Sequence, residues 1–577
     1  MAPQTPAETG PLLLHSGRVF TGTALHRDAT AVLVEDGVVT AVGTDAEVMS
    51  RAGIRAERID LRGGLVTPGF VDAHVHLVMG GVERNACDLT QAAGLEEVLR
   101  AVRCYAAEHP DEPWILGAGW RFGDFPPGVD AAALLDEAGG GRPAYLVNAD
   151  HHSAWASSAA LARAGITAVT PDPADGIIER RLDGAPSGIL HEGAMELLGP
   201  VLPQRSAGQL ARGLATGVEY LHSLGVTGWQ EAILGDYAGY TDVSAAYRRA
   251  RVDGVVTEAA TGALWVPRDL TVQTVPALVQ DFLRRREENA RAGFVTRTAK
   301  IMVDGVPENR TAALLEDYCR CGELTDPART GTGEREDRGL AYLDREVLLA
   351  VGAALDEAGF DLHFHAIGDR AVRWALDTVE AVRTGRPAST GRHHLAHLQL
   401  VHPDDVPRFA ATGTTANLQA LWACEGQQMR EITVPLLGPE RAGWQYPFRS
   451  IHAAGARLCM GSDWPVSTPD PWQALHVAVN RSEPPAARGG PPASPLVPGE
   501  ALNLATALAA YTSGSAWQLR LDGPGRPRGV IAPGAVADLA VADRDPFAAV
   551  AAGDATQIGR TRNVLTLASG KVVHDAR

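Results

Sequence analysis

Short runs in which hydrophobic residues alternate with other residues occur at both ends of the chain. Near the start they cover residues 12–15, 18–20, 31–35, 38–42, 58–60 and 64–66. Asp36-Gly37, between two of these runs, is a strong hairpin signal. Similar runs return at 529–531, 537–541, 564–567 and 570–574. Because chain ends often meet on a protein surface, we expect residues 1–67 and 525–577 to form one small β-sandwich domain.

Between these ends, strand-like apolar runs alternate with helix-like stretches such as 346–358 and 370–384. The strand candidates are 70–77, 226–231, 255–261, 298–303, 361–365, 394–399, 414–418 and 457–460. Eight such units predict an α/β fold, a (β/α)8 TIM barrel over residues 68–524, with its active site at the C-terminal ends of the strands. The long gap after the first run contains strand-like runs of its own. We therefore expect a large insertion after barrel strand 1, at about residues 82–215, and a loop at 484–498.

Bulk properties narrow the partners and the location. The chain has 577 residues and a formal net charge of -17, which gives no support to a nucleic-acid or anionic-membrane partner. No uncharged apolar run reaches the ~18 residues that a spanning helix needs, and Leu12–Leu14 is too short for a signal-peptide core. Six cysteines are scattered along the chain. These features favour a cytoplasmic protein with reduced cysteines, no nucleic acid and no membrane.

The first barrel strand contains the motif His74-Val75-His76 and runs into glycines. Because side chains alternate along a strand, the two imidazoles point to the same side. Neutral imidazole is a common metal ligand. Taken alone, this short motif is about equally well explained by two polar residues on a solvent-facing strand.

Other predicted strand ends carry the same kinds of side chain. They are Lys300 on the fourth strand, His363 and His365 on the fifth, His393, His394 and His397 on the sixth, and Asp463 after the eighth. Each of these alone is more often structural than functional. A lysine in an apolar strand is costly unless its charge is paired or removed. Independent structural causes would not be expected to place His, Lys and Asp at successive strand ends, so the joint pattern favours a metal site.

The complete set of motifs resembles the amidohydrolase superfamily, and within it the branch of N-substituted formamide deformylases and YtcJ-like hydrolases. The superfamily motifs are 68–76, Lys300 with Asp304-Gly305, 365–369, 396–399, 461–465 and 533–539. The likeness to the branch is strengthened by Trp120, 150–152 and 309–313.

The resemblance implies a ligand set and a mechanism. His74, His76 and Asp463 would bind a first metal ion, and His365 and His397 a second. In members with two metals the lysine at the position of Lys300 is carboxylated and bridges the ions, whereas in one-metal members it is unmodified. Zn²⁺ is the expected ion, although other divalent metals fit. Asp463 would be catalytic, taking a proton from the metal-activated water and passing it to the departing nitrogen.

The implied reaction is hydrolysis of a non-peptide C–N bond in a small-molecule amide, such as an N-substituted formamide or a cyclic amide. The same site can also support an esterase, a deaminase or an isomerase, or the barrel can bind a small molecule without catalysis. The insertion would roof the barrel mouth, and we expect Trp120, His152 and Asp304 to contact the substrate. For Trp120, a place in the core is the competing interpretation. By analogy with such barrels, a homo-oligomer is expected.

Overall fold

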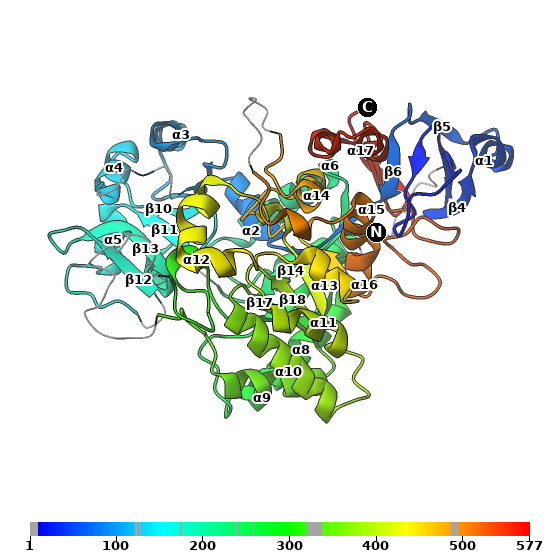
Figure 1. The fold of residues 1–577 in the computed structure, drawn as a ribbon. Coiled ribbons are helices and arrows are strands. Elements are labelled where there is room, and N and C mark those ends of the chain that lie inside the picture. Colours follow the sequence, from blue (N-terminus) through cyan, green and yellow to red (C-terminus); the bar gives the residue numbers. More distant parts are fainter. Residues whose placement is uncertain are drawn as a thin grey trace.

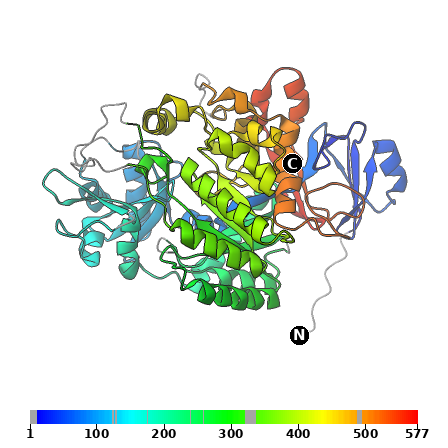
Figure 2. The same ribbon diagram turned by 60° about the horizontal axis from the view of Figure 1, so that its bottom comes forward.

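The computed structural model describes residues 10–121, 125, 129–173, 176–237, 240–257, 259–319, 337–485 and 494–577. Three parts lie in a row in both ribbon views: the insertion on one side, the barrel in the centre and the terminal sheets on the other side (Figures 1 and 2). The loop expected at 484–498 lies partly outside the described residues.

The central sheet has eight parallel strands in consecutive order, so the predicted TIM barrel is confirmed. The strands are β7 (Phe70–Val75), β14 (Val226–Leu234), β15 (Ala260–Trp265), β16 (Val295–Met302), β17 (Asp361–Ala366), β18 (His394–His397), β19 (Thr415–Leu418) and β20 (Leu458–Met460). The last strand is joined to the first by two backbone hydrogen bonds of 2.8 Å, from Asp463 N–H to the His74 carbonyl and from His76 N–H to the Trp464 carbonyl.

The third barrel strand begins later than the sequence pattern predicted. We expected it at 255–261, but β15 starts at Ala260. Helix α7 (Ser244–Val252) ends just before, and the N–H of Val255 bonds to the Ala250 carbonyl, so this valine belongs to the helix exit. The first strand also ends earlier than predicted, because Leu77 already begins helix α2 (Leu77–Arg84).

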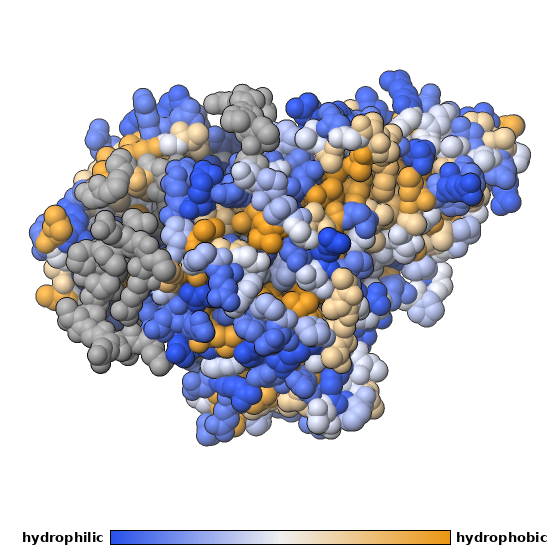
Figure 3. Space-filling model, in the orientation of Figure 1, coloured by the Kyte–Doolittle hydropathy of each residue, from blue (hydrophilic) through white to orange (hydrophobic). Residues whose placement is uncertain are grey.

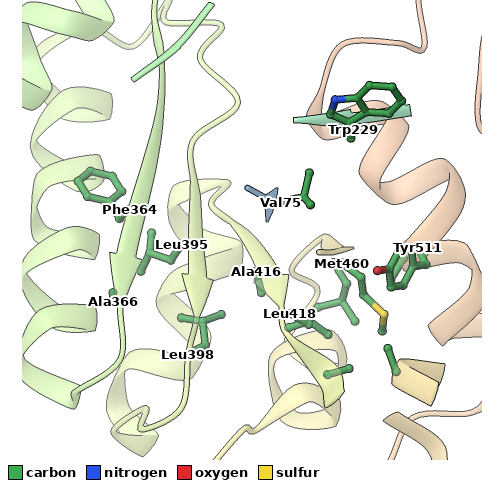
Figure 4. Packing of buried hydrophobic residues seen from close by; sticks show 14 of the residues in the cluster. Val75, Trp229, Phe364, Ala366, Leu395, Leu398, Ala416, Leu418, Met460 and Tyr511 are labelled. Atoms are coloured by element: carbon green, nitrogen blue, oxygen red, sulfur yellow. The ribbon is translucent and has the colours of Figure 1, made fainter. Parts of the chain in front are cut away.

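The barrel strands are buried on both faces. Because side chains alternate along each strand, the polar residues face the inside of the barrel and the hydrophobic residues face the surrounding helices. Phe364, Leu395 and Leu418 belong to the hydrophobic cluster between the strands and the surrounding helices (Figure 4). His363 and His365 flank Phe364 in β17 and therefore point to the opposite, inner side. The helices around the barrel are α6 (Ala207–Ser223), α8 (Val275–Arg291), α9 (Arg345–Glu357), α10 (Asp369–Gly385), α11 (Val406–Thr412), α12 (Val434–Ala442), α13 (Phe448–Ala453), α14 (Pro471–Asn480), α15 (Leu504–Ala509) and α16 (Ser515–Gln518).

Both chain ends contribute to a pair of sheets beside the barrel, in agreement with the predicted sandwich. One sheet has the order β4-β3-β1-β5 and the other β2-β6-β21-β22-β23. Val34 of the first sheet and Val541 and Leu565 of the second belong to one shared core. The strands are β1 (Leu12–His15), β2 (Arg18–Val19), β3 (Ala31–Glu35), β4 (Val38–Gly43), β5 (Glu57–Asp60), β6 (Leu65–Pro68), β21 (Leu539–Ala542), β22 (Asn563–Ala568) and β23 (Lys571–Asp575), with helices α1 (Asp45–Arg51) and α17 (Pro546–Ala551).

The chain leaves the barrel after α2 and builds a separate sheet before returning through α6. This sheet has the order β12-β13-β11-β10-β9-β8 and carries hydrophobic cores of its own. Its elements are β8 (Cys87–Asp88), α3 (Leu95–Glu108), β9 (Ile115–Trp120), α4 (Ala131–Ala138), β10 (Ala144–Asn148), β11 (Ser153–Ala156), α5 (Ser158–Ala164), β12 (Gly176–Arg180) and β13 (Pro186–Glu192). The predicted insertion after barrel strand 1 is therefore present.

The polarity of the surface and the state of the cysteines bear on the expected partners and location of the protein. The face drawn in Figure 3 is mostly hydrophilic, with hydrophobic residues gathered where the terminal sheets adjoin the barrel helices. No helix among the described residues is long and apolar enough to cross a membrane. Cys87, Cys104, Cys424 and Cys459 are free. Cys319 is disulfide-bonded, so the expectation of reduced cysteines is wrong there.

Candidate metal centre

Three side chains from the two ends of the barrel sequence meet at its mouth. His74 lies near the end of β7, His76 caps the start of α2, and Asp463 follows β20. Oδ1 of Asp463 lies 3.2 Å from Nε2 of His74 and 3.1 Å from Nε2 of His76. One ligand atom from each residue lies within 4.8 Å of the others. This spacing suits coordination of a single ion.

The approach of β20 to β7 depends on small and polar groups in the connecting loop. A Cβ at Gly461 would lie 2.6 Å from the backbone nitrogen of His74, so this position needs glycine. Oδ1 of the buried Asp72 accepts N–H bonds from both His74 and Ser462, at 3.1 and 2.9 Å. Asp463 itself has a positive φ of 57°, which turns its side chain toward the two imidazoles.

Three further polar side chains stand beside this group. Nζ of Lys300 lies 3.2 Å from Nε2 of His74. The rings of His365 and His397 are 4.4 Å apart between centroids, and Nδ1 of His397 is 3.9 Å from Oδ2 of Asp463. Together with the first three residues they line one cavity of about 330 Å³. The structure thus brings all six predicted ligands together.

Polar groups behind the ligands orient their rings. Nε2 of His363 lies 3.0 Å from Nδ1 of His74, which leaves Nε2 of His74 facing the cavity. Oδ1 of Asp304 is 3.3 Å from Nδ1 of His365. The same carboxylate accepts N–H bonds from Ile367 at 3.0 Å and Gly368 at 2.8 Å. Such partners fix the tautomer and direction of a metal-binding imidazole.

Burial and mutual charge set the protonation of the group. Burial, followed by the nearby Lys300, lowers the pKa of His74 to about 3, so the imidazole is neutral at pH 7. Burial also lowers the pKa of Lys300 to about 7. Burial alone would raise the pKa of Asp463, but the surrounding imidazoles hold it well below its usual range. Neutral imidazoles around a carboxylate are the protonation states that a metal site requires.

The donor atoms fit a divalent ion. Oδ1 of Asp463 and both ring nitrogens of His397 are buried and have no hydrogen-bond partner among the described residues. Unsatisfied buried polar groups are costly and call for a partner. Imidazole nitrogen and carboxylate oxygen are the ligands that zinc and related ions take. A metal ion would satisfy Oδ1 of Asp463 and one of the two ring nitrogens of His397.

The residues predicted to contact substrate have different places. His152, just before β11, lines the cavity. Asp304 lies behind His365, with its second oxygen also accepting the N–H of Ala313 at 2.9 Å. Trp120 is fully buried in a core of the insertion, where its indole N–H donates to the Leu146 carbonyl at 2.8 Å.

Sequence reasoning assigned no role to two groups at this site. Trp422 stacks on His397, with an interplanar angle of 3° and centroids 5.1 Å apart. Glu192, at the end of β13, bonds to His152. The pair His191-Glu192 at a strand end was the signal available for the second, but no pattern links residue 192 to residue 152. Trp422 lies in a short 3₁₀ turn, and such a turn is too short to show a hydrophobic periodicity in the sequence.

A parallel barrel with buried imidazoles and a carboxylate at the C-terminal ends of its strands defines a metal-dependent hydrolase of the barrel type. The sequence profile described as "Amidohydrolase family" matches residues 57–574. The chain therefore belongs to the amidohydrolase family, with His74, His76 and Asp463 as its metal site.

Relatives cover nearly the whole chain. N-substituted formamide deformylase from Arthrobacter pascens is 30% identical over 569 residues, covering 93% of this chain and 94% of that protein. Putative amidohydrolase YtcJ from Bacillus subtilis is 28% identical over 564 residues, covering 97% and 99%. An uncharacterized metal-dependent hydrolase from Pyrococcus furiosus has the same fold, with a TM-score of 0.66 at 22% identity, covering 93% of this chain and all of that one.

Proposed function

We propose that the protein hydrolyses a non-peptide C–N bond in a small-molecule amide. The observation that carries the proposal is the convergence of His74, His76 and Asp463 with His365 and His397 on one buried cavity. The similarity to an N-substituted formamide deformylase over 94% of that protein supports an amide, and a formamide first.

The residues divide the work of hydrolysis between them. His74, His76 and Asp463 would hold a divalent ion, zinc in our proposal, and the chemistry it would supply is a lowered pKa of a bound water and polarisation of the carbonyl. Asp463 accepts the proton of the attacking water, because its carboxylate is ionised and stands in the middle of the ligand group. The neutral imidazoles His74 and His76 supply ligand nitrogens and take no proton.

Lys300 is the residue we propose to be carboxylated. As a cation it would repel a metal ion beside His74, only 3.2 Å away. Its lowered pKa of about 7 leaves a large share of neutral amine at physiological pH. That amine can add CO₂ with loss of one proton, which would convert a buried cation into an anion that could serve as a metal ligand.

The cavity favours a substrate with a small acyl group and an apolar substituent. Met79, Ile233, Met302 and Ile367 line it together with Trp422. In the proposed binding mode the formyl group lies beside the ligands, and the nitrogen substituent packs against these apolar side chains. Burial of apolar area contributes ~25 cal/mol per Å².

The decisive experiment combines metal analysis with a substrate panel. Purified protein should contain one or two divalent ions per chain and hydrolyse N-alkyl and N-aryl formamides, with activity removed by chelation and restored by Zn²⁺. Activity on 4-nitrophenyl esters alone would favour an esterase. Protein that binds metal tightly and cleaves neither class would instead favour a deaminase, an isomerase or a binding role.

A further inference from the structure

The insertion places a histidine–carboxylate pair beside the metal ligands. Nδ1 of His152 lies 2.8 Å from Oε1 of Glu192. Glu192 ends β13 and His152 comes directly before β11. These two strands pair in the insertion sheet, where Ser153 is opposite His191, and Glu192 N–H donates to the His152 carbonyl at 3.0 Å. The carboxylate side chain is 2% exposed and the imidazole 11%.

Glu192 is held in place by the barrel as well as by the insertion. The hydroxyl of Thr311 donates to its Oε1 at 3.0 Å and that of Tyr342 to its Oε2 at 3.0 Å. Its backbone adopts φ 50°, a conformation that a non-glycine residue keeps only when its surroundings impose it, and which is concentrated at functional sites. The carboxylate therefore has a fixed position relative to the barrel mouth.

The imidazole of His152 faces the reaction cavity. It lines the same cavity as the six ligands, and its ring centroid is 6.1 Å from that of His365. Because Nδ1 is taken by Glu192, Nε2 is the nitrogen available to a bound molecule. Neither Thr311 nor Tyr342 lines the cavity, so of these three partners of Glu192 it is His152 that reaches it.

The charges around the pair favour a protonated ring. Burial alone would lower the pKa of His152, but Glu192, followed by Asp150, raises it to about 9, against a smaller opposing effect of Arg268. Burial alone would raise the pKa of Glu192, yet His152 holds it at about 2. The buried carboxylate 2.8 Å from Nδ1 favours the protonated ring, which leaves the hydrogen on Nε2 available to a molecule in the cavity that His152 lines.

We propose that His152, in place of Asp463, is the acid that protonates the leaving nitrogen and that Glu192 is its positioning residue. This deepens, and rests on, the proposed amide hydrolysis. Water gives one proton to Asp463 and its oxygen bonds to the carbonyl carbon. As the C–N bond breaks, its electron pair stays on nitrogen, which takes the Nε2 proton of His152. Neutral His152 regains a proton from solvent, Asp463 loses one to solvent, and the products are a carboxylic acid and an amine.

Two separate groups serve the reaction better than one. Asp463 is surrounded by the metal ligands and lies where the water is activated, whereas His152 approaches from the roof, beside His365. An amine leaves poorly as an anion and needs a proton, while a 4-nitrophenolate leaves without one. A dedicated acid therefore matters for amides and hardly at all for activated esters.

The test compares His152→Gln with His191→Gln. His191 is the control, since it lies close by in β13, is buried and bonds to Ser153 at 2.9 Å, but it does not line the cavity. In Zn²⁺-loaded enzyme, His152→Gln should lower kcat on N-alkyl formamides by ~10²–10³-fold and on 4-nitrophenyl acetate by less than about tenfold. His191→Gln should change both rates by less than about threefold.

A series of ring-substituted formanilides provides a second measurement of the role of His152, because the leaving anilines differ in acidity. His152→Gln should make kcat depend more steeply on the acidity of the leaving aniline than wild type does. Equal losses on amide and ester, or an unchanged dependence on the aniline, would overturn the assignment of His152 while leaving amide hydrolysis intact. Wild-type enzyme that binds metal but cleaves no amide would instead contradict the proposed function and therefore also the assignment of His152.

Glu192→Gln tests the positioning role. A glutamine keeps an oxygen for Nδ1 but removes the charge, so the pKa of His152 falls. Because the protonated ring is the active form, the alkaline limb of the pH profile of kcat on amides should move to lower pH, with KM nearly constant and metal content unchanged. An unshifted alkaline limb in a folded, metal-loaded variant would contradict the role of Glu192.

Discussion

At the scale of single residues, the site depends most on Asp463, which touches both imidazoles of the first ligand pair. Asp463→Asn keeps the size of the side chain and removes the proton acceptor. We expect the fold to persist and kcat to fall by ~10²–10⁴-fold at saturating Zn²⁺. Circular dichroism, metal analysis and steady-state kinetics check this, and a near-normal rate would rule out the role of Asp463 as base.

Lys300 allows an unusually clean chemical test. The chain has 52 lysines and arginines, but its only lysines are Lys300 and Lys571. Lys300→Ala should lower kcat, and short carboxylic acids such as propionate should restore part of it, because they can take the place of the carbamate. Lys571, on an exposed strand, provides the control substitution Lys571→Ala.

¹³C-bicarbonate labelling gives a second measurement on the same residue. A carbamate signal in wild type should disappear in Lys300→Ala and remain in Lys571→Ala. A fully active wild-type enzyme without any carbamate signal would show that Lys300 works as a free amine.

The sequence made the first ligands predictable for a physical reason. Alternation in a strand puts His74 and His76 on one face, and parallel strands bring their C-terminal ends to one edge, so Lys300, His365 and Asp463 could be expected nearby. Glu192 could not be found this way. Its partner is chosen by the pairing of β11 with β13, and strand pairing across 40 residues leaves no periodic signal in the chain.

At the scale of elements, helix α2 positions one metal ligand, since His76 is its N-cap. Its packing on α6 is unusually close: a Cβ added at Gly81 would lie 1.8 Å from the Gly213 carbonyl oxygen. Gly81→Ala should therefore destabilise the protein by about 1–3 kcal/mol, although alanine favours a helix.

Thermal unfolding of the Zn²⁺-loaded protein measures this effect. Gly385→Ala, at the end of α10, is the matched control, because an added Cβ there meets nothing within 4 Å. The control should leave the midpoint unchanged or raise it slightly. A Gly81→Ala protein as stable as wild type would mean that α2 and α6 can separate without cost, and that their contact does not position His76.

The start of strand β17 was predicted correctly, because apolar residues alternate with polar site residues there. The start of strand β15 was predicted at the wrong position, because the sequence offered apolar residues alone. Strand β17 begins at Asp361 as expected, and its alternating histidines and apolar residues are unmistakable. Strand β15 was expected five residues early, because Val255 and Val256 are as apolar as the strand that follows. Apolar character alone does not separate a helix exit from a strand.

At the scale of the whole molecule, helix α6 connects the barrel to the sheet built from both chain ends. The hydroxyl of Thr566 in β22 donates to the His222 carbonyl near the end of this helix, at 2.6 Å. His222 is 8% exposed, and Nε2 of its ring has no hydrogen-bond partner among the described residues. Burial, with a further effect of His574, lowers the pKa of His222 to about 4.

This buried imidazole makes the junction sensitive to acid. The unfolded chain binds a proton at His222 near pH ~6.5, whereas the folded protein does so only near pH 4. The contribution of His222 to stability is therefore fully present above pH ~6.5 and is lost as pH falls toward 4, by up to about 3 kcal/mol for this one residue.

His222→Leu removes the titration, so the unfolding midpoint of this variant should drop less between pH 7 and pH 5 than that of wild type. His452→Leu, at an exposed position of α13, should leave the acid-induced drop as it is in wild type. Equal drops in all three proteins would place the acid sensitivity elsewhere than at this junction.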